Sequence, residues 1–260
     1  MGRDDHEMSE VGKSIRLKSI FREDGRSLIV ALDHGLGATP VQGLDKPLEV
    51  ISKVWKGGAD AVITTTGTIR RFHKELPRNL GLILSIPTDP NSVRTATNLG
   101  VHAVKNTFFG SLSDEKLRLV HALALECENY GMPLLAEIVP TDPNMGKPVY
   151  EPAKIKAAAR IAVEFGADIL KTNFTGSART FREVVEECPI PILILGGERM
   201  DEDKIVLENV KGAIEAGAAG VAFGRNIFQH RNPTAMTRAI SRLIHEDADV
   251  MEAMKELALR

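Results

Sequence analysis

Residues 152–176 read Pro152-Ala-Lys-Ile-Lys-Ala-Ala-Ala-Arg-Ile-Ala-Val-Glu-Phe-Gly166-Ala-Asp-Ile-Leu-Lys171-Thr-Asn-Phe-Thr-Gly176. The first part predicts a helix over 152–165, because its apolar residues recur at helical spacing. Gly166 is the expected helix stop, since glycine adopts the left-handed conformation without steric cost. The segment 167–173 is short and lacks the polar alternation of a strand with one face in water. The stretch therefore predicts one helix–glycine–strand unit of a parallel sheet covered on both faces.

The same unit recurs along the chain. Strand-like runs rich in Val, Ile or Leu are expected at 28–32, 61–65, 82–86, 101–105, 133–139, 167–173, 190–195 and 220–223. Helical patterns are expected between them, including 47–56, 114–130, 152–165, 179–187 and 203–216. This order predicts an α/β fold, a closed (β/α)8 or TIM barrel, with a doubly wound open sheet as the alternative.

The segments outside these units extend the barrel without adding a domain. Further helices are expected at 11–21 and 247–259, residues 1–10 are expected to be flexible, and 87–99 is short for a full unit. No linker or low-complexity stretch interrupts the 260 residues, a length typical of one barrel domain. Residues 1–260 are therefore expected to form a single barrel domain.

Composition excludes several classes of partner. A hydrophobic content of 43% and a charged content of 26% are ordinary for a soluble protein, and a net charge of -2 gives no electrostatic argument for nucleic acid. No apolar run could cross a membrane, and the polar start lacks an apolar signal region, so a cytoplasmic protein is expected. Two cysteines define no disulfide framework, and without a cluster of metal-ligand spacing neither metal nor cofactor is expected.

Chemistry-bearing residues stand where the expected strands end, which is where barrels place catalytic groups. Asp33 and His34 follow the first strand, Glu137 lies near the end of the fifth, and Lys171 near the end of the sixth. Half-burial among apolar neighbours disfavours the ammonium of Lys171, and a neutral amine can attack a carbonyl to form a Schiff base. The alternative is a lysine that merely extends from a strand end into solvent.

A register argument adds Lys105. Lys105 follows Gly100 by five positions, just as Lys171 follows Gly166. Because side chains alternate along a strand, both lysines are expected to point the same way. A second ammonium would tune Lys171, while Glu137 or Asp33 could move protons. The alternative is a buried Lys105–Glu137 ion pair with a structural role alone.

Glycine-rich turns after the last two strands suggest a phosphate site. Gly196 and Gly197 follow the seventh strand, and Gly224 and Arg225 follow the eighth. Glycines let backbone amides approach an anion, and the arginine supplies positive charge. A lysine nucleophile beside a phosphate site predicts a phosphorylated sugar with a reactive carbonyl as the substrate.

Several motifs together resemble one enzyme family. They are Ala31-Leu-Asp-His-Gly35, Gly166-Ala-Asp-Ile-Leu-Lys-Thr172, Cys188-Pro-Ile-Pro-Ile192, Gly196-Gly197 and Glu215-Ala-Gly-Ala-Ala-Gly-Val-Ala-Phe-Gly-Arg-Asn-Ile-Phe-Gln229. From about residue 11 to the C-terminal helix, the chain resembles the archaeal-type class I fructose-bisphosphate aldolases. These are grouped with deoxyribose-phosphate aldolase, aminodideoxyheptulosonate synthase and the autoinducer-2 phosphate thiolase.

The resemblance implies a (β/α)8 barrel, a homo-oligomer and a role for each matched residue. It implies that Lys171 forms the Schiff base and that Asp33 transfers protons. It also implies that Gly196, Gly197, Gly224 and Arg225 hold the substrate phosphate; His34 is a further candidate for substrate contact.

The match fails at the fifth strand. The family aldolases usually place a tyrosine acid/base before Pro-Arg-Gly, whereas this chain has Val139 at that position. Lys105 stands in place of a small residue, and Glu137 in place of an apolar one. Loss of the tyrosine together with gain of Lys105 and Glu137 suggests a rearranged proton-transfer system.

The favoured hypothesis is a class I aldolase that cleaves or forms a carbon–carbon bond in a phosphorylated ketose resembling fructose bisphosphate. The alternatives are an aminodideoxyheptulosonate synthase, a phospho-dione thiolase whose family member also lacks the tyrosine, and a catalytically inactive phosphosugar-binding barrel.

Overall fold

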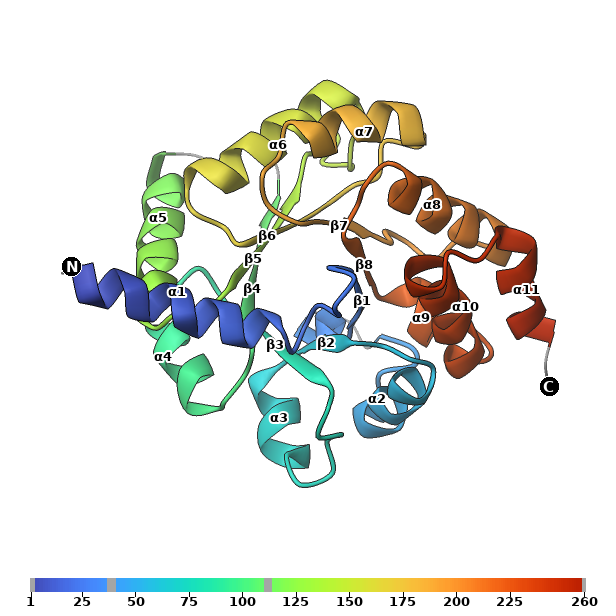
Figure 1. Cartoon of the computed structure of the whole chain (residues 1–260), viewed down its shortest axis with the longest axis horizontal. Helices are drawn as coiled ribbons and strands as arrows, with labels where there is room; N and C mark the ends of the chain where they lie inside the picture. The colour runs from blue at the N-terminus through green and yellow to red at the C-terminus, as the bar shows by residue number, and fades with distance from the viewer. Residues whose placement is uncertain (1–2, 37–40, 110–113, 259–260) are drawn as a thin grey trace.

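A closed parallel barrel forms the centre of the molecule (Figure 1). The computed structural model describes residues 3–36, 41–109 and 114–258. Each strand pairs with the next, and β8 pairs with β1, which confirms the barrel over the open sheet. The strands are β1 (Ser27–Ala31), β2 (Ala61–Thr64), β3 (Gly81–Ser85), β4 (Ala103–Phe109), β5 (Leu134–Val139), β6 (Ile169–Thr172), β7 (Ile192–Leu195) and β8 (Gly220–Phe223).

Helices surround the barrel, and a 3-10 turn (η1, Asp33–Leu36) follows β1. The helices are α1 (Arg3–Leu17), α2 (Pro47–Lys56), α3 (Thr66–Phe72), α4 (Asn91–Asn98), α5 (Asp114–Asn129), α6 (Pro152–Glu164), α7 (Ala178–Glu186), α8 (Asp203–Glu215), α9 (Arg225–Phe228), α10 (Pro233–His245) and α11 (Val250–Ala258). The short segment 87–99 thus contains a helix of its own. Within the described ranges, no helix has the length and apolarity needed to cross a membrane.

The N-terminal helix starts earlier than its sequence pattern predicts. It was expected at 11–21, after a flexible segment, but α1 runs from Arg3 to Leu17. Its polar residues are anchored far along the chain: Ser9 Oγ donates to the Glu128 carbonyl at 2.6 Å, and Lys13 Nζ pairs with Glu128 at 2.7 Å. Residues 1 and 2 of the segment expected to be flexible lie outside the described residues.

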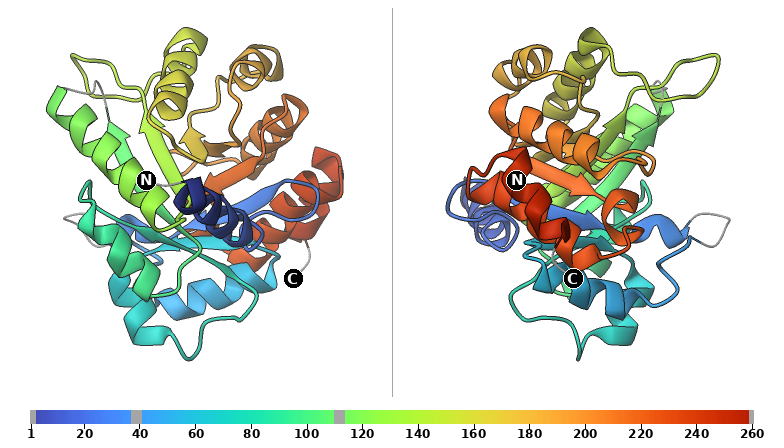
Figure 2. Two further views of the ribbon diagram at one scale, coloured as in Figure 1. Left: turned by 60° about the vertical axis from the view of Figure 1, so that its left-hand side comes forward. Right: turned by 90° about the vertical axis from the view of Figure 1, so that its right-hand side faces the viewer.

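The two ends of the barrel differ in what covers them. Lys13 of α1 also reaches Asp168, which directly precedes β6, so α1 lies at the N-terminal end of the strands. In the right-hand view of Figure 2, α1 lies at one end, while the segment between β5 and α6 projects at the other. The C-terminal strand ends are therefore left open for a site.

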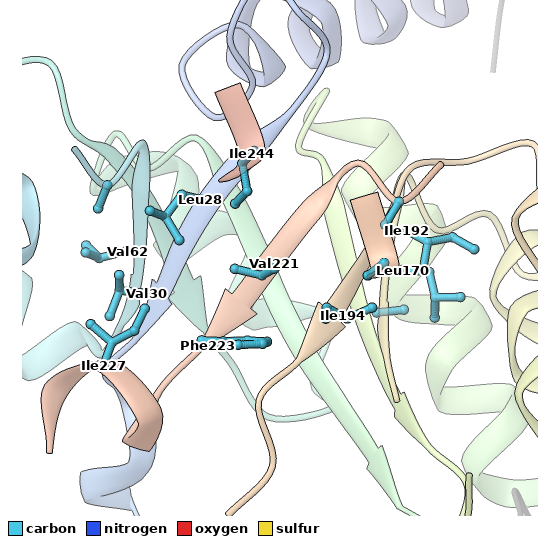
Figure 3. Packing of buried hydrophobic residues seen from close by; sticks show 14 of the residues in the cluster. Leu28, Val30, Val62, Leu170, Ile192, Ile194, Val221, Phe223, Ile227 and Ile244 are labelled. Atoms are coloured by element: carbon cyan, nitrogen blue, oxygen red, sulfur yellow. The ribbon is translucent and has the colours of Figure 1, made fainter. Parts of the chain in front are cut away.

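Buried side chains form one layer outside the barrel and one inside it. The outer layer packs strand residues such as Val30, Leu170 and Val221 against the helices (Figure 3). The inner layer includes Ile20, which reaches in from the segment before β1, and Ile29, Ile83, Ala103, Leu135, Ile169, Leu193 and Ala222. These side chains fill the barrel from its N-terminal end upward.

At the C-terminal end of the strands, the side chains that point into the barrel are polar. Ile169 belongs to the inner cluster, so Lys171, two positions later, points inward as well. By the same alternation, Lys105 points inward like Ala103, and Glu137 points inward like Leu135. Glu137 lies beside Lys171 in the register of β5 and β6. Both lysines point inward, as the register argument predicts.

Candidate active site

A cavity of about 510 Å³ opens at the C-terminal end of the barrel. All nine candidate site residues line it: Asp33, His34, Lys105, Glu137, Lys171, Gly196, Gly197, Gly224 and Arg225. Val139, where the resemblance leads one to expect a tyrosine, lines it too, two positions after Glu137 on β5. The sequence-derived candidates are therefore brought together in one place.

Four charged side chains form a continuous chain across the cavity floor. Lys171 Nζ lies 2.6 Å from Glu137 Oε1, and Lys105 Nζ lies 2.7 Å from Glu137 Oε2. Lys105 Nζ also donates to Asp33 Oδ2 at 2.8 Å. The Lys105 and Lys171 side chains are only 7% and 6% exposed, so neither extends into solvent. The order Lys171–Glu137–Lys105–Asp33 balances two positive charges with two negative ones.

The electrostatics keep the two carboxylates ionised. Burial alone would raise the pKa of Glu137, but the charges and hydrogen bonds of Lys171 and Lys105 outweigh it and lower that pKa well below its ordinary value. Burial also acts to raise the pKa of Asp33, but the positive charges of Lys105 and Lys171 outweigh this effect and lower that pKa. Burial disfavours the charge of Lys105, yet Glu137 and Asp33 raise its pKa. Lys105 therefore stays an ammonium.

Lys171 is the nucleophile best placed for imine chemistry. It must release a proton before it attacks a carbonyl, and Glu137 Oε1 is within hydrogen-bond reach to accept one. Thr107 Oγ1 donates to Glu137 Oε2 at 2.8 Å, so both oxygens of this carboxylate are held in place. The arrangement can form a Schiff base and move protons next to it.

The turns after β7 and β8 are tied together beside this chain of charges. Asn226 Nδ2 donates to the Gly196 carbonyl at 2.7 Å, and Asn226 Oδ1 accepts from the Met200 amide at 2.8 Å. Gly197 has a φ of +63°, which favours glycine. A β-carbon on Gly224 would collide with the His34 ring, so these loops pass too close for side chains.

Two buried nitrogen atoms at the same place lack protein partners. Arg225 Nε and His34 Nδ1 have no hydrogen-bond partner among the described residues. Burial lowers the pKa of His34, and its ring meets the Phe228 ring edge-on at 5.4 Å between centroids. A buried donor without a partner costs free energy unless a ligand satisfies it. Arg225 Nε beside the glycine turns suits an anionic group such as phosphate.

The sequence pattern assigned no role to Ser85 and Asn226. Ser85 lines the cavity and hydrogen-bonds Asp33, and it pairs with Lys105 in the register of β3 and β4. Aligning the expected strand ends could have identified Ser85, because it ends β3 at the same level as Lys105 in β4. Arg70 and Arg71, which follow β2, are exposed and do not line the cavity.

A structured segment borders the cavity from the side of β5. Between β5 and α6, the Val149 amide donates to the Pro140 carbonyl at 3.0 Å, and Pro148 lines the cavity. Asn173 Nδ2, two positions after Lys171, donates to the Val149 carbonyl at 2.9 Å. This segment is therefore fastened to the strand that carries Lys171.

Comparison with known proteins agrees with this geometry. The chain matches the DeoC/LacD family aldolases over residues 27–230. It is 34% identical to an uncharacterized aldolase of Saccharolobus solfataricus, over 95% of this chain and 99% of the relative. It is 33% identical to the 2-amino-3,7-dideoxy-D-threo-hept-6-ulosonate synthase of Halobacterium salinarum, over 97% of this chain and 98% of the relative.

A solved structure is similar along most of the chain. It is an archaeal fructose-1,6-bisphosphate aldolase with its catalytic lysine covalently bound to the carbinolamine intermediate of the substrate. The two share 29% identity and a TM-score of 0.76, with 89% of this chain and 99% of that one covered. This chain, whose barrel carries the buried Lys171 at its C-terminal end, belongs to the DeoC/LacD family of Schiff-base-forming class I aldolases.

Proposed function

We propose that this aldolase cleaves or forms a carbon–carbon bond in a phosphorylated ketose resembling fructose bisphosphate, with Lys171 as the Schiff-base residue. The observation that carries the proposal is the Lys171–Glu137 contact of 2.6 Å in a cavity that also holds the Gly196–Gly197 and Gly224–Arg225 turns. A substrate carbonyl at Lys171 and a substrate phosphate at the turns can then be bound together.

The residues support a reaction in balanced steps. Glu137 accepts a proton from Lys171, and the neutral amine attacks the ketone carbon to give a carbinolamine. Glu137 then returns the proton to the carbinolamine hydroxyl, which leaves as water and gives a protonated imine. A carboxylate removes the proton from the hydroxyl on carbon 4, the bond between carbons 3 and 4 breaks, and its electron pair moves into the imine as an enamine. The carbon-4 fragment leaves as an aldehyde, and the carboxylic acid just formed returns its proton to carbon 3 of the enamine. Water then hydrolyses the resulting protonated imine, which releases the ketone and restores Lys171. Glu137 is the favoured base because it touches Lys171, with Asp33 as the second carboxylate.

Lys105 has a supporting part in this scheme. It binds both Glu137 and Asp33, and its positive charge keeps both carboxylates ionised and in place beside Lys171. The Lys105–Glu137 pair, for which a structural role alone was the alternative, also contacts Lys171 through Glu137. This coupling favours the rearranged proton-transfer system over loss of catalysis along with the tyrosine.

The lining of the cavity favours recognition of one phosphate. Arg225 is the single guanidinium among the described lining residues, and both lysines there are bound to carboxylates. The undescribed residues 37–40 and 110–113 contain no lysine or arginine. The proposed donor is therefore a phosphorylated ketone unit of the dihydroxyacetone phosphate kind, and a second phosphate would be held weakly.

The heptulosonate synthase reaction is the second candidate. It is favoured by 33% identity over 97% of this chain to a relative of that name. Both reactions use an imine on the same lysine, and they differ in the acceptor that takes up the enamine. A homo-oligomer, which the family resemblance implies, and a cytoplasmic location, which the composition suggests, are further proposals, and light scattering after gel filtration tests the first.

A substrate panel tests the proposal. Purified protein is given fructose 1,6-bisphosphate, fructose 1-phosphate and fructose 6-phosphate, and release of triose phosphate or triose is followed with coupled dehydrogenases. Cleavage of the two ketoses phosphorylated at carbon 1, with fructose 6-phosphate inert, is expected. Cleavage that survives in Lys171→Met contradicts the lysine assignment. If no free triose is released but the ketone unit is transferred to a second aldehyde, the synthase is selected. If neither cleavage nor transfer occurs while the sugar phosphate still binds, the inactive barrel is selected.

A further inference from the structure

A second cavity lies at the opposite end of the barrel and has no part in the proposed reaction. Its volume is about 550 Å³, within the range of roughly 300–1,000 Å³ typical of ligand pockets. It is lined by segments that precede the first four strands: residues 18–22, 58–60, 78–80 and 102, together with Trp55 of α2. These positions lie at the N-terminal ends of the strands, away from Lys171.

The floor of this cavity is apolar and one wall is aromatic. Ile20, Ala59 and Leu80 are buried beneath it. Trp55 is 38% exposed, and its indole Nε1 donates to Asn79 Oδ1 at 3.2 Å, which fixes the ring at the rim. An exposed, oriented indole next to buried apolar side chains offers a stacking surface for a planar ring.

Lys18, Arg22 and Arg78 line this cavity together with one carboxylate, Asp60. Arg22 is bound to Asp60 and to the Gly58 carbonyl. Lys18 and Arg78, by contrast, form no ion pair or hydrogen bond within the described part of the chain, and both are exposed. Two free cations therefore border the aromatic wall.

His102 adds a neutral donor. Its Nδ1 accepts a hydrogen bond from the Leu82 amide at 2.9 Å, so the ring hydrogen of the neutral form is on Nε2. Burial, followed by the charge of Arg16, lowers the pKa of His102 and keeps the ring neutral. The cavity thus combines an N–H donor, two free cations and an indole face.

We propose that this cavity binds a small planar aromatic anion, stacked on Trp55 with its charged group between Lys18, Arg78 and His102. The shared chemistry is a flat ring joined to a carboxylate or a phosphate, as in an aromatic acid or a nucleoside monophosphate. The site is independent of the proposed reaction, because none of its lining residues lines the cavity that contains Lys171.

The test uses the single tryptophan of the chain, since Trp55 emission reports on this cavity alone. The full-length protein is titrated with AMP and adenosine, and separately with phenylacetate and phenylacetamide, while tryptophan fluorescence is recorded. A saturable change with AMP but not adenosine identifies a phosphate ligand, and one with phenylacetate but not phenylacetamide identifies a carboxylate ligand. Either result supports the site.

Matched variants decide whether the cations recognise the anion. Arg78→Gln and Lys18→Gln are expected to weaken binding about tenfold each, the loss of one charge-assisted contact. Lys53→Gln removes an exposed lysine of the same helix as Trp55 that does not line the cavity, and should bind as the wild type does. Lys171→Met should also bind unchanged, which separates this site from the catalytic one. Equal binding of the neutral analogues, no saturable change with either anion, or unchanged affinity in both cation variants overturns the proposal.

Discussion

Replacing Glu137 by glutamine removes one negative charge and little volume from the centre of the site. Glu137 holds Lys171 at 2.6 Å with one oxygen and Lys105 at 2.7 Å with the other. Glutamine can still hydrogen-bond there but cannot take a proton from carbon or oxygen. In the proposed mechanism, the variant therefore separates imine formation at Lys171 from proton transfer by the carboxylate.

The expected loss follows from the role of a positioned base. General acid–base catalysis contributes about 10²–10⁴-fold to rate, or about 2.7–5.4 kcal/mol at 1.36 kcal/mol per factor of ten. Glu137→Gln should lower proton transfer by that factor. The lysine remains, so the amount of imine trapped by borohydride should stay within a few-fold of the wild type.

Deuterium exchange measures this step without knowledge of the acceptor aldehyde. Dihydroxyacetone phosphate is incubated with enzyme in heavy water, and loss of the carbon-3 hydrogen is followed by NMR. Glu183→Gln, which alters an exposed carboxylate paired with Lys156, is the matched control and should exchange at the wild-type rate. Wild-type exchange in Glu137→Gln would show that Glu137 is not the base, and loss of trapping together with exchange would show that its role is to support Lys171.

Three further outcomes follow from the same contacts. Lys105→Met leaves Asp33 and Glu137 without their shared cation and should lower the free energy of unfolding by about 3–5 kcal/mol. Lys204→Met, which removes an exposed ion pair, should lower it by about 0–1 kcal/mol, and equal urea midpoints for the two variants would contradict this prediction. Arg225→Gln should raise KM for a phosphorylated ketose by about tenfold or more and leave an unphosphorylated ketose unaffected; equal shifts for both would remove the phosphate role. The pKa of Glu137 and of Asp33 is lower in the folded chain than in the unfolded one, so their stabilisation is present above the ordinary Glu value of 4.5 and is lost as pH falls through the folded-state pKa. Urea unfolding across this pH range should show that acid lowers the free energy of unfolding of Asp33→Asn less than that of the wild type.

Alternation along strands made much of the site predictable. Equal spacing from Gly100 to Lys105 and from Gly166 to Lys171 sufficed to place both lysines on one face. The structure adds the reason: in both strands the residue two positions earlier belongs to the inner cluster. Local sequence therefore determines which face a strand residue takes.

Contacts between distant strands were beyond sequence reasoning. The Asp33–Lys105 pair joins β1 to β4 across the barrel, and its existence depends on barrel diameter and side-chain length. Asn226 bridges two loops by a geometry that glycine motifs alone do not encode. Trp55 is partly exposed beside a cavity that residues 78–80 and 18–22 enclose, and segments this far apart in the sequence give no local signal of such a cavity.

The central claim is that Lys171, and not Lys105, forms the covalent bond to substrate. The most direct measurement is borohydride reduction of the protein in the presence of dihydroxyacetone phosphate and, separately, fructose 1,6-bisphosphate, followed by peptide mass spectrometry. We predict a reduced adduct on Lys171 alone, absent from Lys171→Met and present in Lys105→Met if that variant is folded. An adduct on Lys105, or no adduct with either sugar while turnover proceeds, would contradict the assignment.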